Sequence, residues 1–150
     1  MTTPKLYLLD TNILVALIRA GPVGQYVETT YALTTQPFRP LVSVVSVGET
    51  LKLTKRLGWS DVKISRMQEL LQNLVRVDIG HPQVLEAYAE IACHCEQSHS
   101  TKPQNDYWIA ATANVTGALL LTTDKHFDSL QGKFVERIWI DEEAIKRGSA

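Results

Sequence analysis

Four carboxylates stand where a strand is expected to end or a helix to begin: Asp10, Glu49, Asp106 and Asp124. Asp10 and Asp124 each follow a short apolar run, whereas Glu49 and Asp106 fall close to the starts of two helices. In open α/β sheets, ligands bind beyond the carboxyl ends of the strands. This order therefore predicts that all four acids lie at one edge of one sheet.

Four acids that converge on one edge cannot all remain bare anions. Two like charges about 5 Å apart repel by roughly 3 kcal/mol at an effective dielectric constant near 20. Several of the acids must therefore be protonated, or cations must lie among them. Carboxylate and water oxygens suit Mg²⁺ or Mn²⁺, and no histidine or thiolate occupies these positions to favour zinc. Such an ion can align a water and neutralise charge at phosphorus, which predicts hydrolysis of phosphodiester bonds.

Each acid also has a purely structural explanation. Asp10 and Asp124 could simply end buried strands, and Asp106 could interact with the dipole of its helix. Glu49 could complete a capping box with Ser46. For any single acid the structural explanation is the better one, but the convergence of the whole set favours a metal site.

Basic residues accompany the acids. Lys52 and Arg56 lie three and seven positions after Glu49, so on a helix all three share a face where the two cations could meet phosphates. The alternative is a local ion pair between Glu49 and Lys52 on a solvated face, which would contribute little. Lys125, next to Asp124, is a further candidate for a phosphate contact.

The histidines and cysteines indicate no second site. His126 could act as an acid or contact a phosphate, but we interpret it as a lone surface histidine. Cys93 and Cys95 lie on a predicted helix, where residues two apart point about 200° away from each other. They therefore suit neither a disulfide nor a shared ion. A zinc site that includes His94 and His99 is the alternative to two ordinary reduced cysteines.

Alternating apolar and amphipathic segments must position these residues. Strands are expected at 6–9, 41–45, 75–79, 119–122 and 134–140. Helices are expected at 13–18, 23–33, 46–57, 60–74 and 106–116, from Pro82 through the two cysteines, and after 141. Helix caps are expected at Thr11 or Asn12, Ser46, Ser60 and Asn105. The crossovers are long enough for parallel pairing, which predicts a three-layer α/β/α sandwich with a mostly parallel central sheet.

Length and composition fit this architecture. The chain has 150 residues, of which 45% are hydrophobic and 21% charged, so we expect one globular domain spanning 1–150. No apolar run approaches the roughly 18 residues of a membrane span. The segment Met1–Lys5 lacks the features of a signal peptide, so a cytoplasmic location is expected. The net charge of −1 neither indicates nor excludes a nucleic-acid partner.

Four segments resemble, in the right order, the motifs of PIN-domain nucleases, in particular the small bacterial VapC-type toxins. The segments are Leu8–Leu14, Ser43–Glu49, Asn105–Ala113 and Leu120–Phe127. Each motif alone would be weak, and the specificity comes from their order. The resemblance extends from Leu6 to Ile140.

The resemblance implies a PIN-like fold and a Mg²⁺-dependent endoribonuclease that cuts single-stranded or looped RNA. It also implies a homodimer that a cognate antitoxin protein holds inactive. Residue by residue, it assigns metal binding to Asp10, Glu49 and Asp106, the fourth acidic position to Asp124, orienting roles to Asn12 and Thr122, and a further acid to Asp128. An apolar face on the helices between 23 and 74 is the expected dimer surface.

Two departures from the family pattern concern RNA preference. The loop Ser98–Gln104 lacks the glycine that commonly precedes the third acid, and Thr123 replaces a basic residue that often precedes the fourth. Neither change removes an expected metal ligand.

Three other functions fit parts of the sequence. A haloacid-dehalogenase phosphatase would need an acid two positions after Asp10, where Asn12 stands. A receiver domain would need an acidic pair at the end of the first strand, where Leu9 precedes Asp10, and would leave Glu49 without a role. A PIN-like protein could also bind RNA or a partner without cutting it, although the presence of all four acids favours the enzyme.

Overall fold

A parallel five-stranded sheet forms the centre of the computed structural model, which describes residues 5–150. The strands are β1 (Tyr7–Leu9), β2 (Leu41–Ser43), β3 (Val75–Val77), β4 (Leu119–Thr122) and β5 (Arg137–Trp139). Their order across the sheet is β3-β2-β1-β4-β5, and every neighbouring pair is parallel. The carboxyl ends of all five strands therefore lie at one edge.

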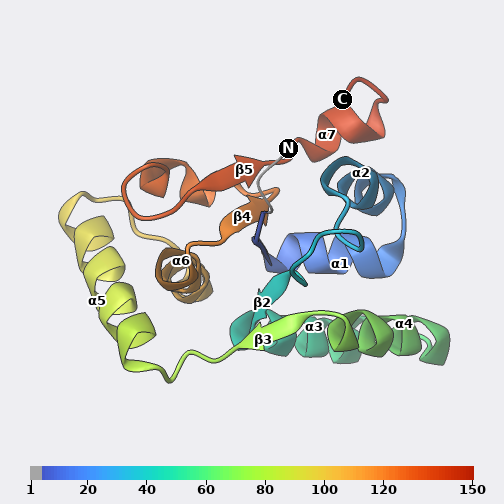
Figure 1. The fold of residues 1–150 in the computed structure, drawn as a ribbon, viewed down its shortest axis with the longest axis horizontal. Helices are drawn as coiled ribbons and strands as arrows, with labels where there is room; N and C mark the ends of the chain where they lie inside the picture. Colours follow the sequence, from blue (N-terminus) through green and yellow to red (C-terminus); the bar gives the residue numbers. More distant parts are fainter. Residues whose placement is uncertain (1–4) are drawn as a thin grey trace.

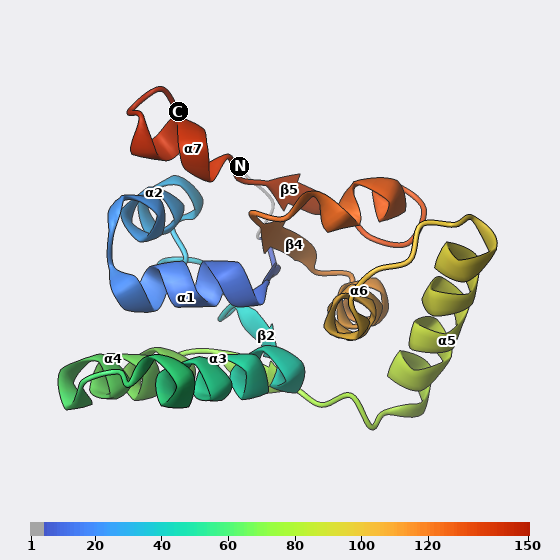
Figure 2. The ribbon, with the colours of Figure 1, turned by 180° about the vertical axis from the view of Figure 1, so that it is seen from behind.

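Helices cover both faces of this sheet (Figures 1 and 2). They are α1 (Thr11–Arg19), α2 (Pro22–Tyr31), α3 (Val44–Leu57), α4 (Asp61–Gln72), α5 (Pro82–Gln97), α6 (Gln104–Thr116) and α7 (Glu142–Lys146), with a 3₁₀ helix η1 at Lys125–Leu130. The α/β/α sandwich expected from the sequence is confirmed, and the strands and helices follow the expected order; η1 was not expected.

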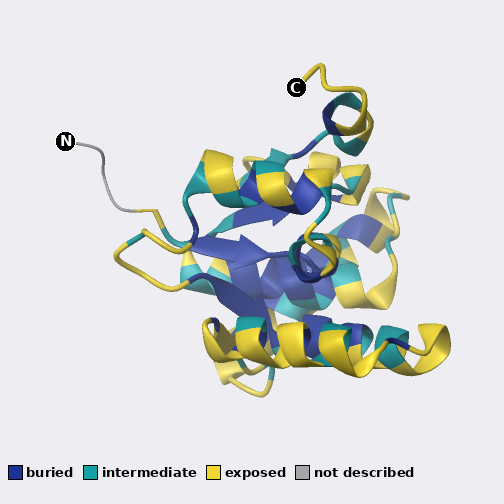
Figure 3. Ribbon diagram, turned by 90° about the vertical axis from the view of Figure 1, so that its right-hand side faces the viewer, coloured by how far each residue is buried: buried dark blue, intermediate teal, exposed yellow. Residues whose placement is uncertain are grey.

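Alternate side chains of the strands divide the core into two layers. Leu9 and Leu121 pack in one cluster with residues of α1, α2, α3, α4 and α7. Leu8 and Leu120 pack on the other face with residues of α5 and α6. The three central strands β2, β1 and β4 are largely buried, whereas the edge strands β3 and β5 are more exposed. Many of the exposed residues lie on the outer sides of the helices (Figure 3). A sheet covered on both faces requires such continuous apolar strands.

The first strand passes directly into α1 through Asp10. The Asp10 N–H donates to the carbonyl of Leu121, so Asp10 continues the pairing of β1 with β4. Its side chain caps α1 by accepting a hydrogen bond from the Thr11 N–H at 2.8 Å. The expectation of a cap at Thr11 or Asn12 was therefore wrong, because the strand's last acid fills that role.

The second strand is shorter than expected and passes directly into α3. Ser43 caps this helix by accepting from the Val45 N–H, so Val44 and Val45 are helical. Ser46 is buried within the helix, and the predicted capping box with Glu49 was wrong. Glu49 instead lies in the second turn of α3, on the side that meets α1.

Three other elements, α6, β3 and β5, differ from expectation at their ends, whereas the expected cap of α4 is present. Helix α6 begins at Gln104 after Pro103, so Asn105 lies in the first turn and does not cap it. Strands β3 and β5 are shorter than expected. Ser60 caps α4 as expected, by accepting from the Lys63 N–H.

Within the described part of the chain, no helix combines the length and apolar character needed to cross a membrane. The expectation that Met1–Lys5 is not a signal peptide concerns mainly residues 1–4, which lie outside the described residues.

Candidate metal and catalytic site

The structure brings the four predicted acids together around one pocket at the carboxyl edge of the sheet. The pocket has a volume of about 370 Å³. Its lining includes Asp10, Asn12, Glu49, Lys52, Arg56, Asp106, Asp124 and His126. Residues from the β1–α1 junction, α3, α6 and the β4–η1 junction, far apart in the sequence, thus share one site.

Asp10 is the most buried acid of the site, with 5% of its surface exposed. Its Oδ1 accepts from the Thr11 N–H, and its Oδ2 accepts from the Thr122 hydroxyl at 2.6 Å. Burial raises the pKa of Asp10 to about 6, against the opposing effect of these two hydrogen bonds. The neighbouring Asp106 and Asp124 add to the rise.

Thr122 connects two of the acids. It is fully buried, and its hydroxyl donates to Asp10 while accepting from the Asp124 N–H at 2.9 Å. This single side chain fixes the carboxylate of Asp10 and the backbone of Asp124 relative to each other.

Glu49 is held by α1. The Thr11 hydroxyl donates to Glu49 Oε1 at 2.7 Å and lies 2.9 Å from the hydroxyl of Ser46. A hydroxyl at the start of α1 therefore orients an acid of α3. The sequence showed Thr11 and Ser46 as caps, and their role here depends on the contact between α1 and α3, which sequence spacing does not reveal.

Asp106 and Asp124 both contact the same ring nitrogen of His126. His126 Nδ1 lies 2.8 Å from Asp106 Oδ2 and 3.1 Å from Asp124 Oδ2. Burial raises the pKa of Asp106, and Asp124 and Glu49 raise it further, while His126 opposes the shift. Our interpretation of His126 as a lone surface histidine was wrong.

A local signal for this role of His126 exists in the sequence. Asp124 caps η1, and its Oδ1 accepts from the His126 N–H at 2.8 Å. An aspartate favours a turn in which its side chain accepts from the backbone N–H two residues later, and that residue here is His126. The turn brings the ring to Asp124, but the contact with Asp106 also requires α6 to lie opposite.

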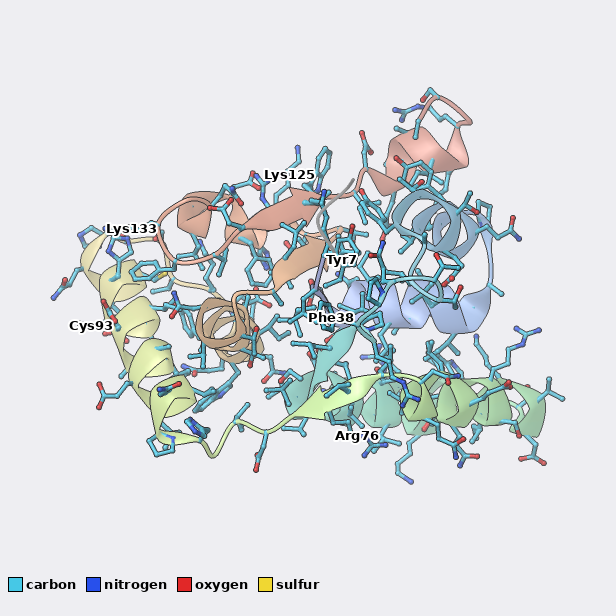
Figure 4. The ribbon with its side chains drawn as sticks, in the orientation of Figure 1. Tyr7, Phe38, Arg76, Cys93, Lys125 and Lys133 are labelled. Atoms are coloured by element: carbon cyan, nitrogen blue, oxygen red, sulfur yellow. The ribbon has the colours of Figure 1, made fainter. Side chains whose placement is uncertain are left out.

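Three expected phosphate contacts differ in their placement. Lys52 and Arg56 line the pocket with Glu49, and Glu49 and Lys52 form no ion pair within the described residues. Lys125 does not line this pocket. Its ammonium group lies 4.5 Å from the centre of the Trp139 ring, beside β5 (Figure 4).

Asp128 also lies apart from the pocket lining. Its carboxylate, in the first turn of η1, pairs with the guanidinium of Arg137 at 2.8 Å. Asn12, in contrast, lines the pocket beside Asp10.

The cysteines do not form a zinc site in the described part of the chain. Cys93 is exposed on α5 (Figure 4), whereas Cys95 is fully buried against the core. The group of described residues that could hold a metal is Asp106, Asp124 and His126, whose ligand atoms all lie within 4.8 Å of one another. Two carboxylates and an imidazole fit a divalent cation.

Comparison with known proteins agrees with this arrangement. The chain resembles VapBC2 from Rickettsia felis, solved bound to a DNA fragment from its promoter, with a TM-score of 0.76, 20% identity, and coverage of 91% of this chain and 99% of that chain. It also resembles VapBC-1 from nontypeable Haemophilus influenzae, with a TM-score of 0.73, 21% identity, and coverage of 89% and 97%.

PAE2754 from Pyrobaculum aerophilum matches with a TM-score of 0.58 and 18% identity, over 97% of both chains. No curated protein matches the chain. These structural similarities establish a shared fold. The family model of the PIN domain matches residues 7–133, which include all four acids. The resemblance drawn from the four motifs is thus confirmed, and the chain belongs to the PIN domain family.

Proposed function

We propose that this protein is a metal-dependent endoribonuclease that acts as the toxin of a toxin–antitoxin pair. The observation that carries the proposal is the convergence of Asp10, Glu49, Asp106 and Asp124 on one pocket that Lys52 and Arg56 also line. Acids that bind a cation and bases that meet phosphates suit a substrate with a phosphodiester backbone.

The acids and the two threonines of the site have different roles. Asp106 and Asp124 hold the cation, Asp10 and Glu49 complete the acidic lining, and Thr11 and Thr122 fix those two carboxylates. When a divalent cation, Mg²⁺ or Mn²⁺, is bound, it would activate a water and neutralise charge at phosphorus.

The basic residues position the RNA. Lys52 and Arg56 lie on the same face of α3 as Glu49, so phosphates that they bind lie beside the acids. Because water and not the ribose 2′-hydroxyl attacks, cleavage leaves a 5′-phosphate and a 3′-hydroxyl.

The test is incubation of the purified protein with a mixed pool of structured and single-stranded RNAs, with Mg²⁺ or Mn²⁺ and with EDTA. Asp10→Asn should abolish metal-dependent cleavage. Asp128→Asn is the matched control, because this acid pairs with Arg137 and does not line the pocket. Cleavage that survives EDTA, or equal activity in both variants, would contradict the proposal.

The remaining candidate is a PIN-like protein that binds RNA or a partner without cutting it. It predicts metal binding without cleavage of any RNA in the pool. The phosphatase and receiver alternatives lose their support, because the chain belongs to the PIN domain family.

Two protein partners belong to the proposal. Several similar structures are VapBC toxin–antitoxin complexes, including VapBC-5 from Mycobacterium tuberculosis at 23% identity, and we propose a cognate antitoxin by analogy.

We also propose a cytoplasmic homodimer. Leu57 and Val62, which are 50% and 69% exposed, lie at the adjoining ends of α3 and α4 and suit its surface. Light scattering measures the molar mass in solution: the wild type should have the mass of a dimer, and Val62→Lys should have the mass of a monomer.

A further inference from the structure

We propose that His126 binds the cation directly through Nδ1, and that this nitrogen ligand makes the site prefer Mn²⁺ to Mg²⁺. The inference rests on the proposed function in one respect, namely that the pocket holds a divalent cation. It names a ligand and a metal preference that the four acids alone do not imply.

The nitrogen of His126 lies at the spacing of a neighbouring ligand from each of the two carboxylate oxygens, and all three atoms lie within 4.8 Å of one another. Neighbouring ligands of an octahedral cation with bonds of about 2.1 Å are about 3 Å apart. His126 Nδ1 lies 2.8 Å from Asp106 Oδ2 and 3.1 Å from Asp124 Oδ2. These distances place the three atoms close enough together to be ligands of one cation.

The backbone places the histidine ring at this point. Asp124 Oδ1 accepts from the His126 N–H, which leaves Oδ2 of the same carboxylate facing the ring. The Asp124 N–H in turn donates to the buried Thr122 hydroxyl. The ring is 49% exposed on its outer side, but the turn that carries it is fixed to the core.

The chemistry of the three atoms decides the preference among metals. Mg²⁺ prefers oxygen ligands and keeps several waters. Mn²⁺ also suits oxygen ligands, but as a first-row transition ion it accepts a nitrogen ligand more readily than Mg²⁺ does. Replacing one oxygen ligand by an imidazole nitrogen therefore favours Mn²⁺ relative to Mg²⁺. A neutral imidazole that binds through Nδ1 carries its proton on Nε2.

The competing explanation is an ion pair without a metal bond. A protonated His126 would neutralise Asp106 and Asp124 at the same two distances, with no preference for Mn²⁺. The two explanations differ in whether the ring nitrogen becomes a ligand when Mn²⁺ is present.

Pulsed electron paramagnetic resonance of the Mn²⁺-loaded protein separates them. A nitrogen bound to Mn²⁺ modulates the electron spin echo, so the wild type should show a ¹⁴N coupling. The coupling should disappear in His126→Ala and His126→Asn. His94→Ala is the matched control and should retain the coupling, because His94 contacts Phe134 and Lys133 away from the pocket.

Calorimetric titration with each metal measures the preference. His126→Asn should weaken Mn²⁺ binding by at least about tenfold, the lower end of what even an indirect metal contact contributes. Mg²⁺ binding should change by less than about twofold, because the amide supplies an oxygen in place of the nitrogen. The asparagine also preserves a polar side chain at a half-exposed position, and circular dichroism checks that this variant folds.

The outcomes also separate this inference from the proposed function. RNA cleavage by wild type that shows no ¹⁴N coupling would overturn the histidine ligand and support the nuclease. A coupling that depends on His126, without cleavage of any RNA, would support the ligand and overturn the nuclease. A coupling that persists in His126→Ala would overturn the ligand, and equal loss of Mn²⁺ and Mg²⁺ affinity in His126→Asn would overturn the preference for Mn²⁺.

Discussion

At the scale of single residues, Asp10 shows the strongest conflict between charge and burial. Its pKa is about 6 in the folded protein, compared with 3.8 for an ordinary aspartate, because burial disfavours the charged form. The folded state therefore binds more protons than the unfolded state between about pH 4 and pH 6. The stabilisation by the protonated form is fully present below pH 4 and is lost as the pH rises through 6.

This linkage predicts how stability depends on pH without divalent cations. Asp10 should contribute a decrease in the free energy of unfolding of about 3 kcal/mol between pH 4 and pH 7. Asp106, whose pKa is also raised, adds a decrease of the same sign. Urea unfolding in EDTA at several pH values measures it. Asp10→Asn should flatten the dependence, Asp128→Asn should not, and parallel curves for wild type and Asp10→Asn would contradict the prediction.

Thr122 offers a second test at this scale. Thr122→Val keeps the shape of the side chain but removes the hydroxyl shared by Asp10 and the Asp124 N–H. We expect a loss of about 1–3 kcal/mol in stability, together with weaker Mn²⁺ binding by calorimetry.

The matched control for this variant is Thr112→Val. Thr112 is equally buried, but its hydroxyl donates to the Trp108 carbonyl within α6. It should lower stability without changing metal affinity. If both variants bind Mn²⁺ as the wild type does, Thr122 does not position the acids.

Sequence order could predict the four acids, since their motifs occur where strands meet helices. It could not predict Thr11 as the partner of Glu49, because that hydrogen bond crosses from α1 to α3. His126 was missed for a similar reason. The turn at Asp124 is local, but the second carboxylate comes from α6.

At the scale of elements, the strand and helix order was predictable and the junctions were not. Val44 and Val45 favour a strand by their β-branched side chains, yet they are helical because Ser43 caps α3 immediately after β2. Packing outweighs this local preference, since the early start places Val47 in the core and Glu49 beside Thr11. Where a strand passes into a helix without a loop, tertiary contacts determine the residue at which the helix begins. The secondary-structure propensity of the local sequence carries no information about those contacts.

The contact between α1 and α2 depends on one glycine. A Cβ added at Gly24 would lie 2.3 Å from the carbonyl oxygen of Ala16 in α1. Gly24→Ala should therefore force the two helices apart and destabilise the protein by about 1–3 kcal/mol. Thermal or urea unfolding measures the change.

Gly48 provides the opposite case. It is exposed on α3, and a Cβ there would meet nothing within 4 Å. Gly48→Ala should stabilise the protein by about 0.5–1 kcal/mol, because alanine loses less conformational freedom on folding. The same unfolding measurement tests Gly48→Ala. For the preceding prediction, a Gly24→Ala variant as stable as the wild type would show that α2 can move away from α1 without loss of stability.

At the scale of the whole molecule, the site lies where the sheet reverses its direction of growth. From β1 the chain continues to β2 on one side, whereas β4 continues to β5 on the other. The carboxyl ends of the adjacent strands β1 and β4 therefore form the topological switch point, which is where open parallel sheets bind ligands. Asp10 and Asp124 follow these two central strands, and α3 and α6 supply the remaining acids from opposite faces.

A cation at this point would join elements of both core layers, which predicts that metal stabilises the entire fold. At a concentration 100 times the dissociation constant, binding should add about 2.7 kcal/mol, or roughly 5–10 °C in Tm. Thermal unfolding with and without Mn²⁺ or Mg²⁺ measures this shift. Asp106→Asn should reduce it and raise Tm in EDTA, because it removes one of several repelling charges, while Asp128→Asn should retain it. An equal metal-induced shift in both variants would mean that the ion binds elsewhere, and the convergence of acids would then need another explanation.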